Sequence, residues 1–321
     1  MNALPSGNSV EDLSGETPGD LDSRLIAALR KDARLSSVKL AEQAGTTRAA
    51  VSAHLDRLRR SGRIRIIAAV NPELLGLSAY AHVAVRVSGS VDEVARRIAE
   101  LRAAPFVSVT SGEYQIVTEL RLPGQAELYG TMTEIRSIPG VERINSLIYL
   151  EVVGGTLMPS LPLADIALDS RDLALIELLQ EDGRMSFAEL AERVGLSPSA
   201  TRSRVNSLIA QQVIRIAPVI SRSRASDGVV AGIGLNLRDA ADEIVARLME
   251  APQVEYFART LGRHDAIATV AGVSTAELDG FINRLMTSEH VTGVTSWLHL
   301  RIVKERYEWP LPTLEELAAR R

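Results

Sequence analysis

The second half of this 321-residue sequence repeats the first half at a fixed shift of 150 positions. The stretch SSVKLAEQAGTTRAAVSAHLDRL, from Ser36 to Leu58, returns as SFAELAERVGLSPSATRSRVNSL, from Ser186 to Leu208. Gly112 and Gly262 obey the same shift, so the repeat extends well beyond this stretch. Repetition at a fixed period predicts that one architecture occurs twice on the chain.

The repeated stretch predicts two helices joined by a tight turn. Ser36 is a suitable N-cap for a helix over 37–44, and Gly45 supplies the positive φ that a helix end favours. Thr47 can cap a second helix that runs to about Arg60. Apolar residues at helical spacing are expected to face inward: Val38, Leu40, Ala41, Ala44, Ala50, Val51, Leu55 and Leu58. With an amphipathic helix over 22–32, this is the pattern of a helix-turn-helix domain.

The chain after the helix-turn-helix changes its period. A strand over 64–70 is expected to be either a wing or a linker strand. Strands are then predicted over 80–87, 106–109, 115–122 and 144–153, with helices over 91–103 and 125–137. The second copy predicts strands near 229–237, 256–260, 266–271 and 294–303, with helices near 240–250 and 276–288. The β-α-β-β-α-β order is that of a ferredoxin-like module.

The predicted fold class is therefore α+β, with two winged helix-turn-helix modules, each followed by a ferredoxin-like βαββαβ effector module. The expected divisions are a disordered arm at 1–19, DNA-binding domains at 20–72 and 168–222, effector domains at 73–155 and 223–305, a linker at 156–167 and a C-terminal tail at 306–321.

Composition excludes several classes of protein. The chain has no cysteine, which excludes disulfides and thiolate metal sites. No apolar run approaches the ~20 residues that span a bilayer, and no secretory signal is visible, so we expect a cytoplasmic protein without a membrane partner. The five histidines lack metal-ligand spacing, and no phosphate-binding glycine loop is present. We expect no catalytic residues, no metal and no cofactor.

The motifs resemble those of the leucine-responsive and asparagine-synthase regulator family, Lrp/AsnC. The residues that carry the resemblance are Leu168-Asp169, Asp172, Asp182-Gly183-Arg184, Leu190-Ala191, Gly195-Leu196-Ser197-Pro198, Arg204-Val205, Ala69-Val70-Asn71-Pro72, Thr110, Gly112, Tyr114, Ile138-Pro139-Gly140-Val141, Thr260, Gly262 and Asp265. The resemblance implies a regulator that binds double-stranded DNA and responds to an amino acid or a related small molecule. Most members carry one unit, so a tandem chain implies an intrachain pseudo-dimer or a homo-oligomer.

The resemblance places the DNA-binding residues on the second helix of each helix-turn-helix. The candidates are Thr47, Arg48, Ser52, His54, Arg57, Arg59 and Arg60 in the first copy, with Arg63 and Arg65 beside them, and Ser197, Ser199, Arg202, Ser203 and Arg204 in the second. Residues 22–65 hold 11 Lys/Arg and 4 Asp/Glu, or +7, whereas 172–215 hold 5 and 6, or −1. Because phosphate neutralisation supplies much of DNA affinity, the first copy is expected to bind more strongly.

The resemblance places effector contacts in a turn of each effector module. The family pattern is Gly-x-aromatic-Asp. The first copy has Gly112 and Tyr114, with Gln115 in place of the acid. The second has Gly262 and Asp265, with His264 in place of the aromatic residue. An acid can bind a ligand ammonium, and turn N–H groups can hold a carboxylate.

Two other functions remain open on this sequence. Sirohaem decarboxylases resemble the family in fold, and under that alternative Arg263 and His264 would face a tetrapyrrole. The other alternative is an effector-sensing partner whose DNA-binding domains have lost their function, against which the positive charge of the first copy argues.

Overall fold

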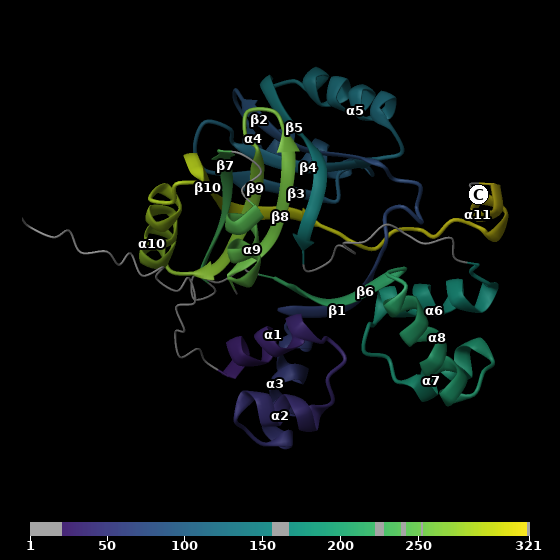
Figure 1. Cartoon of the computed structure of the whole chain (residues 1–321). Helices are drawn as coiled ribbons and strands as arrows, with labels where there is room; N and C mark the ends of the chain where they lie inside the picture. The colour runs from purple at the N-terminus through teal and green to yellow at the C-terminus, as the bar shows by residue number, and fades with distance from the viewer. Residues whose placement is uncertain (1–20, 156–166, 222–227, 239–241, 252, 320–321) are drawn as a thin grey trace, which may run out of the picture.

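The computed structural model describes residues 21–155, 167–221, 228–238, 242–251 and 253–319 (Figure 1). The expected arm at 1–19 and the linker at 156–167, except for residue 167, lie outside these ranges. Figure 1 shows two helical heads below a β-rich body, with a two-stranded ribbon between the heads and the body.

Each head contains three helices and one strand. The first head is α1 (Leu21–Lys31), α2 (Ser37–Ala44), α3 (Arg48–Arg60) and β1 (Ile64–Val70); the second is α6 (Ser170–Glu181), α7 (Phe187–Val194), α8 (Pro198–Ala210) and β6 (Ile214–Ile220). The predicted caps are confirmed: Ser36 accepts the Lys39 N–H, and Gly45 has a φ of 62°. Val38 is an error of prediction, because its side chain is 50% exposed. The neighbouring Leu40 and Ala41 fill the core instead.

Strands β1 and β6 pair with each other and so join the two heads. Their antiparallel register is centred on Ile67 opposite Ala217, which are related by the 150-residue shift. The same 150-residue shift relates the two outer pairs to each other: Ile64 is equivalent to Ile214, and its partner Ile220 is equivalent to Val70. A pseudo-twofold axis therefore passes through the middle of the ribbon. The strand is a linker strand shared by both heads.

Two equivalent arginines fasten the heads to one another. Arg184 of the second head donates to the carbonyls of Ala33 and Leu35, at 2.7 and 2.8 Å. Arg34 of the first head donates in return to the carbonyls of Gly183 and Met185, at 2.5 and 3.0 Å. Burial lowers the pKa of both guanidiniums from the ordinary value. These reciprocal contacts fix how the heads lie relative to each other.

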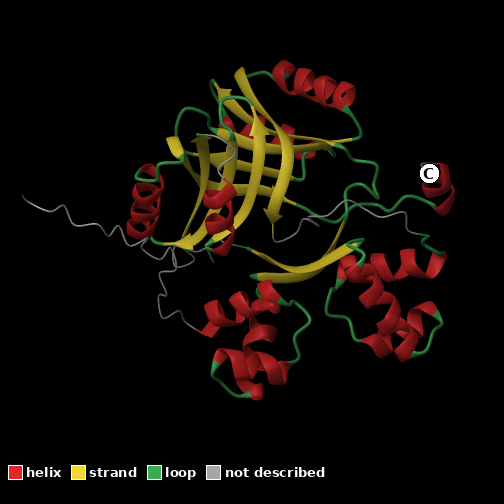
Figure 2. Cartoon of the chain, in the orientation of Figure 1, coloured by secondary structure: helices red, strands yellow, loops and turns green. Residues whose placement is uncertain are grey.

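The two effector modules close into one barrel. The first contains β2 (Ala79–Val87), α4 (Val91–Glu100), β3 (Phe106–Thr110), β4 (Ile116–Leu122), α5 (Gln125–Ser137) and β5 (Val141–Gly155). The second contains β7 (Val229–Leu237), α9 (Asp242–Glu250), β8 (Val254–Leu261), β9 (Ala266–Val273), α10 (Thr275–Met286) and β10 (Val291–Glu305). The strand order is β10-β3-β4-β2-β5-β8-β9-β7, and β7 closes on β10. The helices cover the outside (Figure 2).

The contacts between the modules obey the same pseudo-symmetry. Tyr149 on β5 is opposite Thr260 on β8, and its equivalent His299 on β10 is opposite Thr110 on β3. Because β5 and β10 pair along both edges, each is longer than predicted, at 15 residues. The predicted helix over 91–103 instead ends at Glu100, where Leu101 turns to an extended backbone.

Alternate strand residues separate two kinds of core. One face of each sheet packs Val, Ile, Leu and Phe against the outer helices. The other face points into the barrel, where polar and aromatic side chains meet. His82 is 7% exposed and its ring lies 5.4 Å from that of Trp297. Burial, with the charges of His299, Arg263 and His264, lowers the pKa of His82 to about 3. Burial also lowers the pKa of His264 to about 4.

The C-terminal segment returns to the second head. The Trp309 N–H donates to Gln180 Oε1 at 2.8 Å, and Gln180 Nε2 donates to the Trp309 carbonyl at 3.1 Å. A short helix follows, α11 (Leu314–Ala319), as predicted from Thr313 onward. None of the helices in the described ranges is both long and apolar enough to cross a bilayer.

Replacing Arg184 by glutamine should loosen the fixed pair of heads. Losing two hydrogen bonds from a charged donor is expected to lower the free energy of unfolding by about 1–3 kcal/mol, measured by urea denaturation. Arg193→Gln is the matched control, because among the described residues Arg193 makes only an exposed i,i+4 pair with Glu189. Equal effects of the two substitutions would refute the role assigned to Arg184.

The buried histidines predict a loss of stability in mild acid. The pKa of His82 is depressed from 6.5 to about 3 in the fold, so the unfolded chain binds the proton more readily. Stability is therefore complete above pH 6.5 and falls as the pH is lowered toward 3. For His82 alone the loss should be roughly 2 kcal/mol between about pH 6.5 and 4.5.

The matched substitutions are His82→Leu and His290→Gln, measured by urea denaturation across this pH range. His82→Leu should flatten the pH dependence. His290 has a side chain that is 29% exposed, and its replacement should leave the slope in place. If His82→Leu left the pH dependence of the free energy of unfolding unaltered, the loss of stability in acid could not be attributed to His82.

Candidate DNA-binding surface and effector turns

The start of α3 carries the exposed polar residues predicted to read DNA. Thr47 is the N-cap and its hydroxyl accepts the Ala50 N–H at 3.2 Å. Arg48 occupies the first turn of α3 and is exposed, and Ser52 follows on the exposed surface. Within the described ranges, no hydrogen bond or ion pair engages the Arg48 side chain. A helix N-terminus with a free guanidinium is suited to phosphates and to base edges in a major groove.

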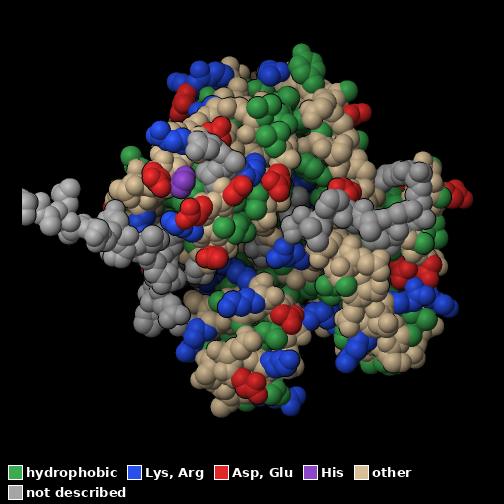
Figure 3. Space-filling model, in the orientation of Figure 1, with side chains coloured by type: hydrophobic (Ala, Val, Ile, Leu, Met, Phe, Trp, Pro, Cys, Tyr) green, Lys and Arg blue, Asp and Glu red, His purple; other side chains and the backbone are tan. Residues whose placement is uncertain are grey.

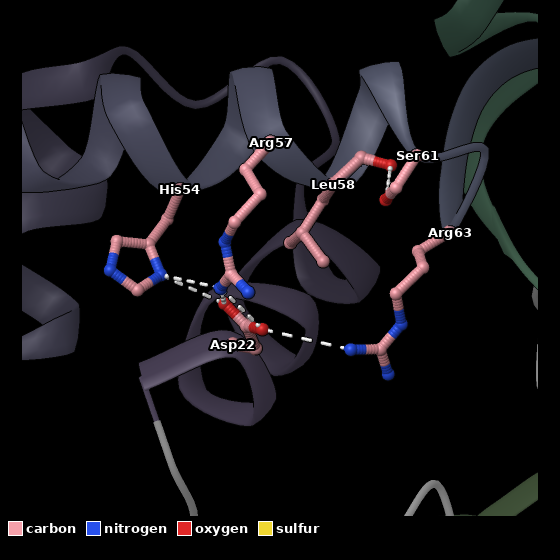
Figure 4. Close-up of polar contacts among 6 residues, drawn as sticks. All are labelled: Asp22, His54, Arg57, Leu58, Ser61 and Arg63. Carbon is pink, nitrogen blue, oxygen red and sulfur yellow. Dashed lines mark hydrogen bonds and ion pairs between the residues drawn. The ribbon is translucent and has the colours of Figure 1, made fainter. Parts of the chain in front are cut away.

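Two residues expected to point outward instead turn onto a buried carboxylate (Figure 4). Asp22 of α1 is 5% exposed. His54 Nδ1 lies 2.9 Å from its carboxylate, and Arg57 donates to both oxygens at 2.7 and 2.8 Å. Arg63 adds a contact at 3.8 Å. Burial alone would raise the pKa of Asp22, but the hydrogen bonds from His54 and Arg57 outweigh it and lower that pKa.

The second head keeps this contact in a different form. Arg204, equivalent to His54, lies 2.8 Å from Asp172 and 2.9 Å from Asp169. The hydrogen bond that Arg204 donates to Asp172 raises the pKa of Arg204. One carboxylate therefore meets two arginines and a histidine in the first head, whereas two carboxylates meet one arginine in the second. The local charge is more positive in the first head.

The remaining candidate side chains contact other residues of the protein. Arg59 pairs with Asp182 at 2.7 Å, Arg65 pairs with Glu308, and Arg60 donates to the Asp56 carbonyl at 3.2 Å. In the second head Ser197 caps α8, the Ser199 hydroxyl lies 3.1 Å from that of Ser197, and Arg202 lies over the Phe187 ring at 5.0 Å. Figure 3 shows Lys and Arg side chains spread over the visible face of the first head.

Sequence reasoning missed the carboxylates that organise these helices. Asp22 and Asp172 are identical residues at the 150-residue shift, and Asp172 also belongs to the family pattern, but neither observation gave it a role. Nothing local showed that each lies beneath the recognition helix, because the contact joins residues 32 positions apart.

The two effector turns have the same internal construction. Thr110 Oγ1 donates to the Tyr114 carbonyl, and Thr260 Oγ1 donates to the His264 carbonyl. Asp265 accepts the Leu237 N–H at 2.8 Å. Gln115 accepts the equivalent Val87 N–H at 3.0 Å, so glutamine preserves the backbone contact that the acid makes in the other copy. Gly112 and Gly262 have φ values of 97° and 151°.

The fold brings the two turns together around Tyr114. Its side chain is 8% exposed, and the guanidiniums of Arg143 and Arg263 lie 5.6 and 5.1 Å from the ring centroid. Arg263 comes from the second turn, and a Cβ on Gly262 would collide with Leu147 at 2.7 Å. Glu113 lies 3.7 Å from Arg263 and pairs with Arg143.

His264 occupies the place of the aromatic residue in the second turn. It is 5% exposed, and its ring packs so closely on Gly234 that a Cβ there would meet it at 2.5 Å. Its Nδ1 lies 3.2 Å from Asn236 Oδ1. No group of three histidine or carboxylate side chains in the described part of the chain is arranged to hold a metal ion.

Sequence patterns of known families cover most of the chain. The AsnC-type helix-turn-helix domain matches residues 168–209, the winged helix-turn-helix DNA-binding domain matches 20–65, and the Lrp/AsnC ligand binding domain matches twice, at 78–156 and 229–309.

Curated relatives match one unit at a time. An uncharacterised HTH-type transcriptional regulator of Pyrococcus abyssi is 33% identical over 148 residues, which cover 43% of this chain and 94% of that protein. The glutamate uptake regulatory protein of Zymomonas mobilis is 27% identical, over 48% of this chain and 97% of its own.

Among solved structures, the sirohaem decarboxylase NirDL aligns with a TM-score of 0.60 at 16% identity, covering 94% of this chain and 99% of its own. At that identity the likeness shows the shared fold alone. The family patterns and the 33% relative decide the assignment: the chain belongs to the Lrp/AsnC family of DNA-binding transcriptional regulators and carries the family's two-domain unit twice.

Proposed function

We propose that this regulator reads DNA with two unequal heads and that it responds to an amino acid or a related small molecule. The observation that carries the proposal is the contrast between equivalent helices on a fixed frame. Arg48 has Pro198 as its equivalent, and Arg57 has Ser207. The first head thus has cations at both ends of its recognition helix, where phosphates of a major groove lie.

The Asp22 contact supports this division of roles. Because Arg57 is held by Asp22 yet 53% exposed, its guanidinium is oriented while remaining accessible to a phosphate. Arg204 is held between two carboxylates, which offset its charge toward DNA. We therefore assign the stronger phosphate contacts to the first head, and we place the protein in the cytoplasm with its DNA.

The cluster around Tyr114 supports an effector site at the turns. Arg86, Arg143 and Arg263 carry three positive charges and surround Glu113. Glu142 lies 3.3 Å from Arg86, which leaves the cluster with a net charge of +1. A carboxylate of the effector would neutralise this remaining positive charge, beside Gly112 and Gly262. The glutamate uptake regulatory protein among the relatives supports an amino-acid effector.

We propose a regulator in preference to a decarboxylase on the same fold. Under the enzymatic alternative His264 would face the tetrapyrrole, but its imidazole is buried against Gly234 and Asn236 inside the barrel. Incubation of the purified protein with sirohaem is expected to leave the absorption spectrum and the number of carboxylates unchanged. Loss of carboxylates would overturn this choice.

Arg48→Ala should weaken DNA binding more than Arg202→Ala. Loss of one phosphate contact is expected to reduce affinity by roughly tenfold and the slope of log K against log salt by about one. Fluorescence anisotropy on the protein's own promoter, repeated over a range of salt, measures both. Arg97→Ala on the outer helix α4 is the control, because Arg97 pairs only with Glu93 in the part of the chain that the structure describes. A larger effect of Arg202→Ala would reverse the proposed order of the heads.

Arg143→Gln should weaken the response to the effector without weakening DNA binding in its absence. The substitution removes one of three charges that would hold a carboxylate. A panel of amino acids added to the anisotropy assay identifies the effector and measures its half-effective concentration. Arg136→Gln on α5, a cation away from the cluster, is the control. An unchanged half-effective concentration in Arg143→Gln would place the effector elsewhere.

A further inference from the structure

A cavity of about 100 Å³ lies between the barrel and the ribbon that joins the heads. Its floor comes from barrel strands of both modules. Its other walls are Pro218, Val219 and Ile220 of β6, together with Arg30 of α1. It therefore contacts three parts of the chain at once: the two effector modules and the DNA-binding frame. It is distinct from the turns around Tyr114, which do not line it.

The cavity lies on the pseudo-twofold axis, because it is lined by pairs of equivalent residues. Phe106 and Tyr256 are one such pair, and Gly155 and Glu305 are another. A perfectly symmetric dimer would place identical side chains opposite each other there. Two buried glutamates or two buried arginines would then repel.

This chain avoids that repulsion by differing at the lining positions. Glu119 and Arg121 on β4 have Thr269 and Ala271 as their equivalents on β9. The charged pair thus comes from one module only, and its smaller equivalent Thr269 lines the same cavity. A site of this kind is possible only when the two copies can diverge.

Arg121 is a buried cation with hydrogen-bonding capacity to spare. It is 6% exposed, and within the described residues its guanidinium makes one hydrogen bond, of 3.3 Å, to Glu119. Tyr149 also donates to Glu119, at 3.3 Å, and the Tyr307 ring lies 5.8 Å from the guanidinium. Burial opposes the charge, but Glu119 together with Tyr256, Tyr307 and Tyr149 outweighs it and keeps the pKa of Arg121 above the ordinary value. Most of its five N–H donors remain available to a planar anion such as a carboxylate.

Carboxylates predominate around the rest of the lining. Glu255 pairs with Arg30, and Glu305 accepts the Tyr307 hydroxyl at 3.1 Å. Three glutamates therefore face two arginines, which favours an ammonium group and disfavours a dianion. Tyr256 and Tyr307 provide ring faces that also attract a cation. An apolar cavity of about 150 Å³ accommodates the six heavy atoms of benzene, so this smaller one suits a molecule of about four or five heavy atoms.

We propose that this axial cavity binds a small zwitterionic amino acid, with its carboxylate on Arg121 and its ammonium among Glu119, Glu305 and the tyrosine rings. The occupied cavity contacts β6 and Arg30, so binding is coupled to the position of the heads. The coupling rests on the proposed DNA-binding function, whereas the binding does not.

The test is a calorimetric titration of the full chain with glycine, L-alanine and L-serine, with ethylamine and propionate as half-ligands. At least one amino acid should bind saturably at one site per chain. Each half-ligand should bind at least about tenfold more weakly, because each lacks one of the two charged contacts. Absence of saturable binding by all three amino acids, or propionate binding as tightly as they do, overturns the proposal.

Two substitutions assign the binding to the cavity. Thr269→Leu fills the space and keeps both charges, and Arg121→Gln removes the guanidinium; each should weaken binding at least about tenfold. Circular dichroism checks the fold, and Thr269→Leu keeps the test decisive if Arg121→Gln does not fold. Arg136→Gln on the outer helix α5 should leave this affinity unchanged. Binding that survives Thr269→Leu overturns the assignment.

Coupling is measured separately as the change in DNA affinity on addition of the amino acid that binds. The change should shrink in Arg30→Gln, which lines the cavity from the first head. Amino-acid binding that Arg143→Gln weakens and Thr269→Leu leaves unchanged would sink the inference and leave the proposed function intact. Ligand binding in the cavity without DNA binding would contradict the proposed function and leave the inference about the cavity intact.

Discussion

The pairing of β1 with β6 is the constraint on which the rest of the structure depends. Because its register is centred on Ile67 and Ala217, equivalent residues of the two copies become related by one axis. Arg34 and Arg184 then fasten each head to the backbone of the other. The same axis relates the two junctions of the barrel, at Thr110 with His299 and at Thr260 with Tyr149. A single chain thus builds what a homodimer builds from two.

A tandem chain differs from a homodimer because its copies can diverge on a shared frame. The divergence includes the positions proposed to bind a ligand and DNA. In the heads, three basic side chains meet Asp22, whereas one meets Asp169 and Asp172. In the barrel, the Glu119–Arg121 pair has the smaller Thr269 and Ala271 as its equivalents, and the large ring of Trp297 lies on Gly232. The frame is symmetric, and the surfaces that it presents are not.

Local patterns in the sequence predicted the elements well. The caps at Ser36 and Thr47, the turn at Gly45 and strand β1 follow from neighbouring residues, so local chemistry sufficed. Contacts between distant parts of the sequence could not be predicted from these local patterns. The closure of the barrel, the β1–β6 register and the Asp22 contact join segments whose proximity depends on the whole fold. Gln115 looked like the loss of an acid until its bond to the Val87 N–H showed a shared backbone role. The residues proposed to hold an effector are likewise brought together by contacts between distant parts of the sequence.

The central claim is that one chain presents two rigidly paired but unequal DNA-reading heads. Hydroxyl-radical footprinting of the full chain on its preferred DNA, at increasing salt, tests it most directly. We expect two protected patches that appear at the same protein concentration, because the heads are fixed to each other. One patch should fade before the other as salt rises, because the heads carry different charge. Two patches of equal salt sensitivity, or patches that fill at separate protein concentrations, would contradict it.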